Sequence, residues 1–290
     1  AKRLHLGTFC DHQLGLLCPS GRGVKTPYVL LYRQSRDTMD AVELAAARAC
    51  FPSVAQRTQV PSGAVAIGRY SVLPFYRELD LAERGASLIN SFAQHRYVAD
   101  VSSWYPHLAR LTPETWLAWE DIPDDVGALV VKGRTNSRKF SWKTHMFAEN
   151  KRAASEVAWR LLEDAVIGDQ DLCFRRFVPL RTYHVGLQGL PITEEYRFFV
   201  CDGEVLCGAY YWSGHRDDIE DVPDPARVPK AFLDDVVARV GQRVRFFVVD
   251  VGITAEGNPI VIELNDGQMS GLSDNDPVRL YSRLREVLDR

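Results

Sequence analysis

No apolar run in the chain approaches the length of a membrane-spanning helix, and no signal-peptide pattern opens it. The six cysteines are scattered without Cys-x-x-Cys pairs, which argues against a metal motif and favours reduced thiols in a cytoplasm. The formal net charge of −3 argues against a generic binder of polyanions, although local basic patches stay open. These absences predict a cytoplasmic protein without a membrane segment or a disulfide framework.

The composition is that of an ordinary globular protein. With 290 residues, 46% hydrophobic and 25% charged, the chain can form one large domain or two to three small ones. Strands are predicted at Tyr28–Tyr32 and Val65–Gly68, and strong helix formers between them predict a helix at Asp40–Cys50. This order of strand, helix and strand predicts a small α/β unit with parallel strands. We therefore expect an N-terminal α/β domain over residues 1–90, and we assign no function to residues 1–27.

Beyond residue 90, helices and antiparallel strands are expected. Helices are predicted at Thr112–Asp121, Glu149–Val166 and Pro229–Val240, with a closing helix from Asp276. Single strands are predicted at Ala128–Lys132 and Cys173–Val178. A hairpin is predicted over residues 195–212, because the pair Asp202-Gly203 is one of the strongest signals for a two-residue turn.

A second predicted hairpin, residues 245–265, carries polar residues in otherwise apolar strands. Side chains alternate between the faces of a strand, so Glu263 and Asn265 share a face. A two-residue loop, in either of its registers, places Asp250 opposite Glu263 or Asn265. A three-residue loop would pair Asp250 with Leu264. The two-residue loop therefore predicts that all three polar side chains gather on one face.

Two carboxylates and an amide oxygen in apolar strands would be poorly solvated without a cation. So small a number of hard oxygen ligands suits Mg²⁺, which retains some waters and takes its remaining ligands from substrate phosphates. The alternative is an edge hairpin with one face in water, where alternating polar residues are common. The hairpin alone favours the second interpretation, so the rest of the chain has to decide.

The segment Lys132–Lys143 concentrates five cations within twelve residues. A lysine at the end of a buried strand, followed by a flexible loop, is a common way to hold polyphosphate. The Gly-x-x-x-x-Gly-Lys-Ser/Thr spacing of a Walker loop is absent. Two other interpretations stay open: a solvated basic hairpin tip, and a nucleic-acid patch in which Phe140 and Trp142 stack on bases.

Arg197 lies in a predicted strand with apolar neighbours and shares a face with Glu195. An inward-facing arginine in a sheet requires a partner. That partner is either Glu195 or a cross-strand carboxylate, or else a phosphate of a ligand.

The order of these pieces is more specific than any one of them. A strand that ends in Lys132 is followed by a flexible loop, a helix and a strand that ends in Phe177-Val178-Pro179. An arginine-bearing hairpin comes next, and then Asp250 and the Glu-x-Asn sequence at Glu263–Asn265. In this order of elements the chain resembles the ATP-grasp superfamily of ligases. The resemblance covers roughly residues 100–290. It implies an α/β (α+β) fold, with a pre-grasp domain at 1–90 and two α+β subdomains, 91–180 and 181–290, that clasp ATP.

The resemblance also implies roles for the matching residues. Those implied to bind ATP are Lys132, Arg134, Lys139, Arg175, Phe177, Val178 and Glu195, with the adenine hinge at Phe177-Val178. Those implied to act in catalysis are Lys139, Arg197 and Arg216. Those implied to hold Mg²⁺ are Asp250, Glu263 and Asn265.

The implied activity is the ATP- and Mg²⁺-dependent ligation of a carboxylate, activated as an acyl phosphate, to an amine or similar nucleophile. The expected partners are small-molecule or peptide carboxylates and amines, and a nucleic-acid substrate stays open but is not favoured. Because an acyl phosphate hydrolyses easily, the loop Gly133–Lys139 is expected to act as a lid that excludes water. The acid, the acceptor and the oligomeric state are not predicted.

Three features depart from the family pattern. The loop after Lys132 is rich in Arg, Asn and Ser rather than glycine, and Arg175-Arg176 stand where many members have Gln or Glu. Trp212 occupies the place of a second phosphate-binding arginine, with His215 and Arg216 just beyond. These departures predict an atypical, compact clade.

A rival interpretation is a phosphotransferase, or an enzyme that modifies nucleic-acid ends at the same ATP site. Val130-Val131-Lys132 and Asp250-Val251-Gly252 superficially resemble the lysine and Asp-Phe-Gly motifs of protein kinases. The complete catalytic-loop signature His-Arg-Asp-Leu-x-x-x-Asn does not occur between them.

Overall fold

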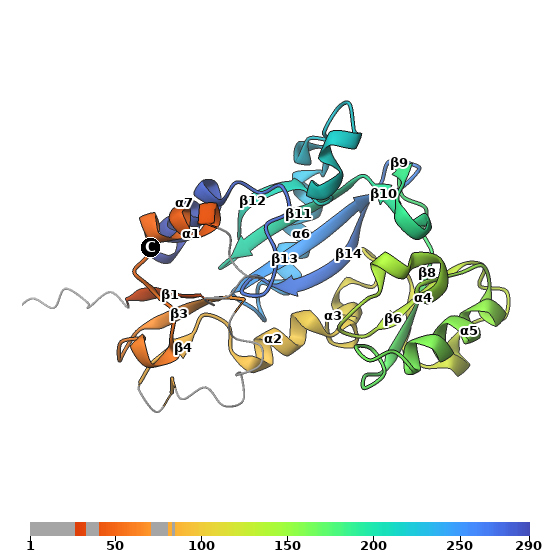
Figure 1. Ribbon diagram of the computed structural model, residues 1–290, viewed down its shortest axis with the longest axis horizontal. Coiled ribbons are helices and arrows are strands. Elements are labelled where there is room, and N and C mark those ends of the chain that lie inside the picture. The colour runs from red at the N-terminus through yellow and green to blue at the C-terminus, as the bar shows by residue number, and fades with distance from the viewer. Residues whose placement is uncertain (1–26, 33–40, 71–80, 83–84) are drawn as a thin grey trace, which may run out of the picture.

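The computed structural model describes residues 27–32, 41–70, 81–82 and 85–290. Within these ranges the strands form three four-stranded sheets and one two-stranded hairpin. Figure 1 shows the sheets following one another along the long axis of the molecule, with helices packed over them. The predicted mixed α/β fold class is confirmed. No helix in the described part of the chain is both long and apolar enough to cross a bilayer.

The first sheet consists of short parallel strands in the order β2-β1-β3-β4. Its elements are β1 (Tyr28–Tyr32), α1 (Ala41–Cys50), β2 (Ser53–Val54), β3 (Val65–Arg69) and β4 (Ser87–Leu88). The predicted strand–helix–strand unit with parallel strands is therefore confirmed. The predicted helix start, Asp40, lies outside the described residues.

This first sheet shares a hydrophobic core with the C-terminal part of the chain. Leu30 and Ile67 pack in one buried cluster with Phe199, Phe246 and Leu284. The last helix, α7 (Pro277–Leu288), packs against α1, as Figure 1 shows. The predicted boundary at residue 90 thus falls between two regions that are joined by a common core.

The second sheet is antiparallel, in the order β5-β8-β6-β7. Its strands are β5 (Thr115–Trp116), β6 (Leu129–Gly133), β7 (Phe147–Ala148) and β8 (Leu172–Arg176). The helices of this region are α4 (Trp142–His145) and α5 (Lys151–Leu162). The buried face of α5 packs on this sheet through Ala154, Val157 and Leu161. The helix begins at Lys151 rather than Glu149 because Asn150 caps it, with a side-chain oxygen that accepts from the Ala153 N–H at 2.9 Å. It ends at Leu162, before the predicted Val166.

The helix predicted over Thr112–Asp121 is wrong. The segment instead contains β5 and a short 3₁₀ turn, η3 (Trp119–Asp121). The Thr115 backbone pairs with Arg175 of β8, and the Thr112 hydroxyl donates to the Val261 carbonyl at 2.7 Å. Strand pairing and burial supplied by distant segments outweigh the local Thr-Pro helix signal, which is a weak preference by itself.

The third sheet is antiparallel, in the order β12-β11-β13-β14, and lies at the centre of the molecule. Its strands are β11 (Glu195–Cys201), β12 (Glu204–Tyr210), β13 (Phe246–Ile253) and β14 (Pro259–Asp266). The β11–β12 hairpin is confirmed: Asp202 and Gly203 have positive φ angles of 45° and 82°, as a mirror-image two-residue turn requires.

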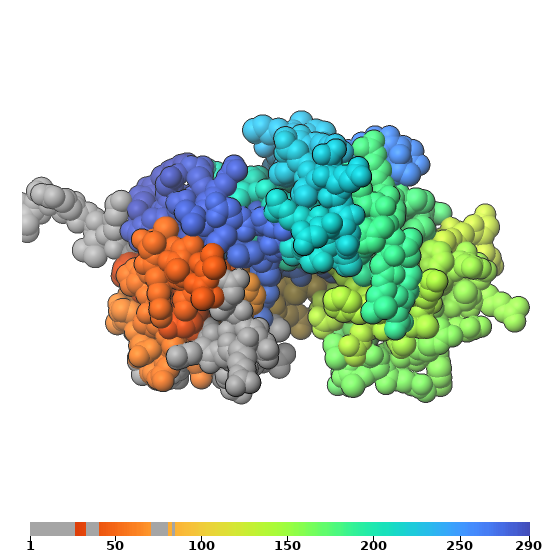
Figure 2. Space-filling view, turned by 45° about the horizontal axis from the view of Figure 1, so that its top comes forward, coloured from red at the N-terminus to blue at the C-terminus, as the bar shows by residue number. Residues whose placement is uncertain are grey.

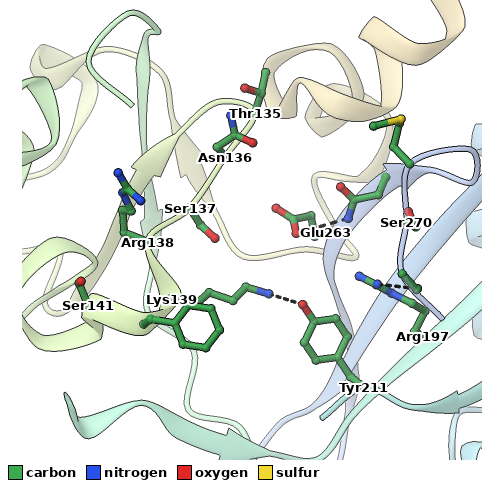
Figure 3. Close-up of a pocket in the computed structure, with 14 residues that line it drawn as sticks. Thr135, Asn136, Ser137, Arg138, Lys139, Ser141, Arg197, Tyr211, Glu263 and Ser270 are labelled. Carbon is green, nitrogen blue, oxygen red and sulfur yellow. Dashed lines mark hydrogen bonds between the residues drawn. The ribbon is translucent and has the colours of Figure 1, made fainter. Parts of the chain in front are cut away.

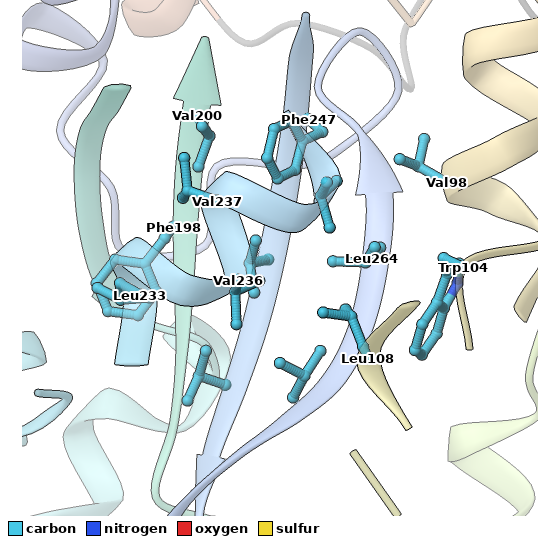
Figure 4. Packing of buried hydrophobic residues seen from close by; sticks show 14 of the residues in the cluster. Val98, Trp104, Leu108, Phe198, Val200, Leu233, Val236, Val237, Phe247 and Leu264 are labelled. Carbon is cyan, nitrogen blue, oxygen red and sulfur yellow. The ribbon is translucent and has the colours of Figure 1, made fainter. Parts of the chain in front are cut away.

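One face of this sheet is covered by three helices. They are α2 (Phe92–Ala99), α3 (Val101–Leu108) and α6 (Lys230–Val240). Figure 4 shows Val236 of α6 and Trp104 of α3 packed beside Phe198 and Leu264 of the sheet. The opposite face is apolar at one end, where Phe199 and Val248 meet the N-terminal region and α7. Its other end carries the polar residues described below.

The turn between β13 and β14 differs from the prediction. The Thr254 N–H donates to the Asn258 carbonyl at 2.9 Å, which closes a three-residue loop with Gly257 at a φ of 92°. A register shift between Asp250 and Val251 then leaves Ile262 as an extra residue in β14, so that Asp250 pairs with Glu263. The expectation that a three-residue loop destroys this pairing is wrong, because the bulge restores it.

Candidate active site

Two neighbouring cavities lie where the second and third sheets face each other. The polar cavity, of about 420 Å³, is lined by residues 135–141 after β6 and, on the other side, by Arg197, Tyr211, Glu263 and Asn265. Figure 3 shows Lys139 reaching from one of these groups toward Tyr211 of the other. Figure 2 shows the surface hollowed between the blue C-terminal and the green residues. Residues far apart in the chain therefore form opposite walls of one site.

The apolar cavity, of about 190 Å³, adjoins the polar one and shares Ser137, Lys139 and Glu263 with it. Its walls are mainly aromatic and aliphatic and include Val130, Trp142, Met146, Phe177, Val178, Leu190, Trp212 and Ile262. The predicted hinge residues Phe177 and Val178 therefore lie in this wall. An apolar slot that opens into a cation-lined space suits a ligand with a flat apolar group and an anionic tail.

Lys132 and Glu263 form a buried ion pair between β6 and β14. The Lys132 ammonium donates a short hydrogen bond to the Glu263 carboxylate. Burial alone would raise the pKa of Glu263, but the charges of Lys132 and Lys139 outweigh it and hold that pKa well below its usual range. Glu263 is therefore ionised at neutral pH.

Lys139 lies between the two cavities. Its ammonium donates to the Tyr211 hydroxyl at 2.7 Å and lies 4.5 Å from the centre of the Tyr211 ring. Burial disfavours the charged form, yet Tyr211 and the carboxylates of Glu263, Glu195 and Asp250 outweigh burial and raise the pKa of Lys139. The lysine thus remains a fixed positive charge at the junction of the cavities.

Arg197 and Asp250 form a second buried pair. They lie directly opposite each other on β11 and β13, and two guanidinium nitrogens donate to the two carboxylate oxygens at 2.8 Å each. Arg197 also donates to the Gly271 carbonyl at 2.9 Å. Of the partners that the sequence left open, the structure therefore places a cross-strand carboxylate beside Arg197.

Glu195 has other partners. It accepts a short hydrogen bond from the Thr193 hydroxyl and one of 3.2 Å from the Trp212 indole. Burial raises the pKa of Glu195, and the charge of Lys139 opposes this rise. Glu195 lines the apolar cavity with Trp212, so this wall carries one carboxylate that is difficult to ionise.

Three residues with implied roles, Arg134, Arg175 and Arg216, have partners within the protein. Arg134 pairs with Asp100 at 2.7 Å and lines neither cavity. Arg216 is exposed, lies 3.7 Å from Asp274 and lines neither cavity. Arg175 contacts the apolar cavity, but one of its guanidinium nitrogens donates to the Ile262 carbonyl at 2.6 Å. Because Ile262 is the extra residue of the bulge, Arg175 supports the register of β14.

Sequence reasoning missed Tyr211 and Gly271, which line the polar cavity, and assigned no role to Ser270 beside them. Tyr211 lies near the end of the predicted second hairpin strand and directly after β12 in the structure, so its aromatic ring at a strand end was an available signal. Ser270 and Gly271 follow Asp266 in an irregular segment with no local motif, so only the fold places them at the site.

The hard oxygen donors at the cavity fit a magnesium ion. Glu263 and Asn265 both line the polar cavity, and their side chains lie 3.4 Å apart through a weak hydrogen bond. A carboxylate and an amide oxygen are the donors that Mg²⁺ prefers, with water and phosphate as its other ligands. Asp250 lies opposite Glu263 on the neighbouring strand β13, but both of its carboxylate oxygens accept hydrogen bonds from Arg197. It would contribute only if this pair opened.

The fold has several solved counterparts. The RimK domain ATP-grasp protein from Sphaerobacter thermophilus is 19% identical, with a TM-score of 0.57, over 91% of this chain and 100% of the other. D-cycloserine synthetase DcsG is 16% identical, with a TM-score of 0.58, over 90% and 99%. D-alanine–D-alanine ligase from Bacillus anthracis, complexed with ATP, is 14% identical, with a TM-score of 0.55, over 91% and 97%. At these identities the likeness establishes the fold.

Sequence comparison gives a more direct assignment. No curated protein matches the chain. The model of one protein family, described as the ATP-grasp domain, R2K clade family 3, matches residues 119–284. This match covers more than half of the 290 residues and includes both ion pairs of the site. The chain therefore belongs to R2K clade family 3 of the ATP-grasp domain.

Proposed function

We propose that the protein is an ATP- and Mg²⁺-dependent ligase that activates a carboxylate and joins it to an amine or similar nucleophile. The observation that carries the proposal is the junction of the two cavities, where Lys132, Lys139 and Glu263 meet. An apolar slot for a base next to buried cations for phosphates is the arrangement that phosphoryl transfer from ATP requires. The structural neighbours include D-alanine–D-alanine ligase and D-cycloserine synthetase, which supports this reaction class over others.

In this proposal the adenine occupies the apolar cavity against Phe177, Val178 and Trp212. The phosphates extend across the junction into the polar cavity, and their charge is neutralised by the ammonium groups of Lys132, which lines the apolar cavity, and of Lys139, which lines both. The segment 135–141 covers this part of the cavity. It is held at its start by the bond from the Thr135 N–H to Gln170 at 2.9 Å and at its middle by the pairing of Arg138 with Asp164. Its role as a closing lid stays a prediction.

Glu263 and Asn265 would hold Mg²⁺ at the inner wall of the polar cavity. When bound, the ion supplies positive charge to the β- and γ-phosphates during transfer. Lys132 pairs with Glu263, so its ammonium would lie beside these oxygen donors, as a cation for the phosphates.

The proposed chemistry has two steps. An oxygen of the substrate carboxylate attacks the γ-phosphorus, the bond from that phosphorus to the ADP oxygen breaks, and an acyl phosphate forms. The nitrogen of the amine then attacks the acyl carbon, the bond to the phosphate oxygen breaks, and the nitrogen loses its proton to solvent. Arg197, which lines the polar cavity, would neutralise the transferred phosphoryl group.

A screen for ADP release tests the function directly. We expect the protein to release ADP from ATP and Mg²⁺ only with a particular pair of carboxylate and amine, and mass spectrometry should show the amide. Glu263→Ala should lose this turnover, whereas Glu256→Ala, in the exposed hairpin turn, should retain it. Wild-type turnover in Glu263→Ala would overturn the metal assignment. A phosphorylated product without an amide would favour the phosphotransferase.

A further inference from the structure

Three metal-ligating side chains meet outside the two cavities. His184 lies in β9 (Thr182–Val185), which pairs with β10 (Pro191–Thr193), whereas His215 and Asp218 lie in the 3₁₀ segment η6 (Ser213–Asp218). One ligand atom from each of the three lies within 4.8 Å of the others. None of the three residues lines the polar or the apolar cavity. The cluster is therefore separate from the proposed ATP and magnesium site.

The separations between the three ligand atoms are those of a tetrahedral face. His184 Nε2 lies 3.3 Å from His215 Nδ1, His215 Nδ1 lies 3.1 Å from Asp218 Oδ2, and His184 Nε2 lies 3.7 Å from Asp218 Oδ2. With metal–ligand bonds of about 2.0–2.1 Å, tetrahedral geometry places ligand atoms about 3.3–3.4 Å apart. Octahedral neighbours at the same bond length would lie about 2.9 Å apart. The observed values average close to the tetrahedral spacing.

A hydrogen-bond network accounts for this triangle less well. His215 Nδ1 carries at most one proton, yet it lies within bonding distance of both His184 and Asp218. The third separation, 3.7 Å, is too long for a hydrogen bond. A single cation at the centre of the three lone pairs would satisfy all three contacts at once.

We propose that His184, His215 and Asp218 bind one zinc ion, with the fourth coordination position open to water or to a ligand. Two imidazole nitrogens and a carboxylate oxygen are a donor set that suits zinc. The side chains are 29%, 33% and 58% exposed, so a metal has access from solvent. The proposal rests on this geometry alone and is independent of the ligase activity.

The zinc site would fix one wall of the apolar cavity. It joins β9 to η6, and η6 directly follows Trp212, whose ring lies 6.4 Å from the His215 ring. Thr182 lies in β9 with His184, two residues away, and both Thr182 and Trp212 line the apolar cavity. A metal that links the two segments would therefore hold the cavity wall in place.

Metal titration of the full-length chain tests the proposal. The protein is freed of metal and titrated with Zn²⁺ against a chromogenic chelator, in excess Mg²⁺ so that the oxygen site is saturated. We expect one tight equivalent that His215→Ala loses and that Asp218→Asn binds at least about tenfold more weakly. The matched controls His145→Ala and Asp217→Asn should bind as the wild type does, and circular dichroism should show all four variants folded.

Two further readouts make the test specific to this geometry. Co²⁺ in place of zinc should give the intense visible absorption of a tetrahedral site, and this band should be missing in His215→Ala. Zn²⁺ should also raise the melting temperature of the wild type but not of His215→Ala, because only the folded site binds the ion. Equal zinc affinity in the wild type and in both cluster variants would overturn the proposal, as would an absence of tight binding or a weak octahedral-type cobalt spectrum.

Discussion

The surroundings differ between two buried arginine–carboxylate pairs, Arg69–Glu43 and Arg197–Asp250, in the part of the chain that the structure describes. Arg69 donates to Glu43 at 2.7 Å and 3.1 Å and to the Gly267 carbonyl, and the Tyr281 hydroxyl also donates to Glu43 at 2.8 Å. The Arg69 side chain is fully buried. Arg197 binds Asp250 with comparable geometry, but its guanidinium lines an open cavity.

The difference indicates what each pair does. The Arg69–Glu43 pair joins β3, α1 and α7, which belong to the two ends of the chain, so it stabilises the contact between these regions. The Arg197–Asp250 pair can exchange its internal partner for a ligand, because an anion or a cation can reach it from the cavity. Similar hydrogen bonds therefore serve stability in one place and binding in the other.

Breaking the enclosed pair should have the largest effect. Arg69→Ala leaves the Glu43 carboxylate buried without its arginine, and we expect the free energy of unfolding to fall by about 3–5 kcal/mol. Urea denaturation measures the change. The double variant Glu43→Leu/Arg69→Met should regain much of the loss, because it removes both charges and keeps the volume. A loss below about 1 kcal/mol in Arg69→Ala would contradict the stabilising role.

Arg197→Ala is the matched change at the cavity. We expect turnover, once the substrates are known, to fall by about 10²–10³-fold because a charge that faces the transferred phosphoryl group is lost. Its free energy of unfolding should fall less than that of Arg69→Ala, since the vacated space admits water to Asp250. A larger loss of stability than in Arg69→Ala, with turnover unchanged, would reverse the comparison.

Lys132→Ala should have a smaller effect, on ATP affinity. Loss of one cation beside the phosphates is expected to weaken ATP binding about tenfold, or about 1.4 kcal/mol. Isothermal titration calorimetry in the presence of Mg²⁺ measures it. Lys230→Ala, which removes an exposed lysine paired with Asp234 on α6, should bind ATP as the wild type does. Unchanged affinity in Lys132→Ala would remove this lysine from the phosphate site.

The smallest expected effect is on the pH dependence of stability, to which Glu263 and Glu195 contribute with pKa shifts in opposite directions. The pKa of Glu263 is lowered by its lysines against burial, so its contribution to stability is present above about pH 4.5 and declines as the pH falls below that value. The pKa of Glu195 is raised by burial, so its ionisation lowers stability as the pH rises above about 4.5. Urea denaturation of Glu263→Gln and Glu195→Gln at several pH values separates the two.

For Glu263→Gln we expect the loss of stability relative to the wild type to shrink toward acidic pH. For Glu195→Gln we expect the stability relative to the wild type to improve as the pH rises. Parallel pH profiles for the two variants and the wild type would show that neither carboxylate has a perturbed pKa.

Much of the site followed from local patterns. Alternation placed Glu263 and Asn265 on one face, and the expected pairing of Asp250 with Glu263 is present. The carboxylate partners of Arg134 and Arg216 could not be predicted in this way, because motif order carries no information on which carboxylate a long side chain will reach. Arg134 donates a hydrogen bond to Asp100, which lies thirty-four residues earlier in the chain.

Short-range signals were enough for the β11–β12 hairpin, for the capped start of α7, and for the parallel unit around β1. They act through backbone dihedral preferences and through periodicity, which need only neighbouring residues. Contacts between distant segments produced the bulge at Ile262, turned Thr115–Trp116 into a strand, and brought His184 to His215. These features depend on the register and burial of strands that meet only after folding, so no local pattern in the chain encodes them.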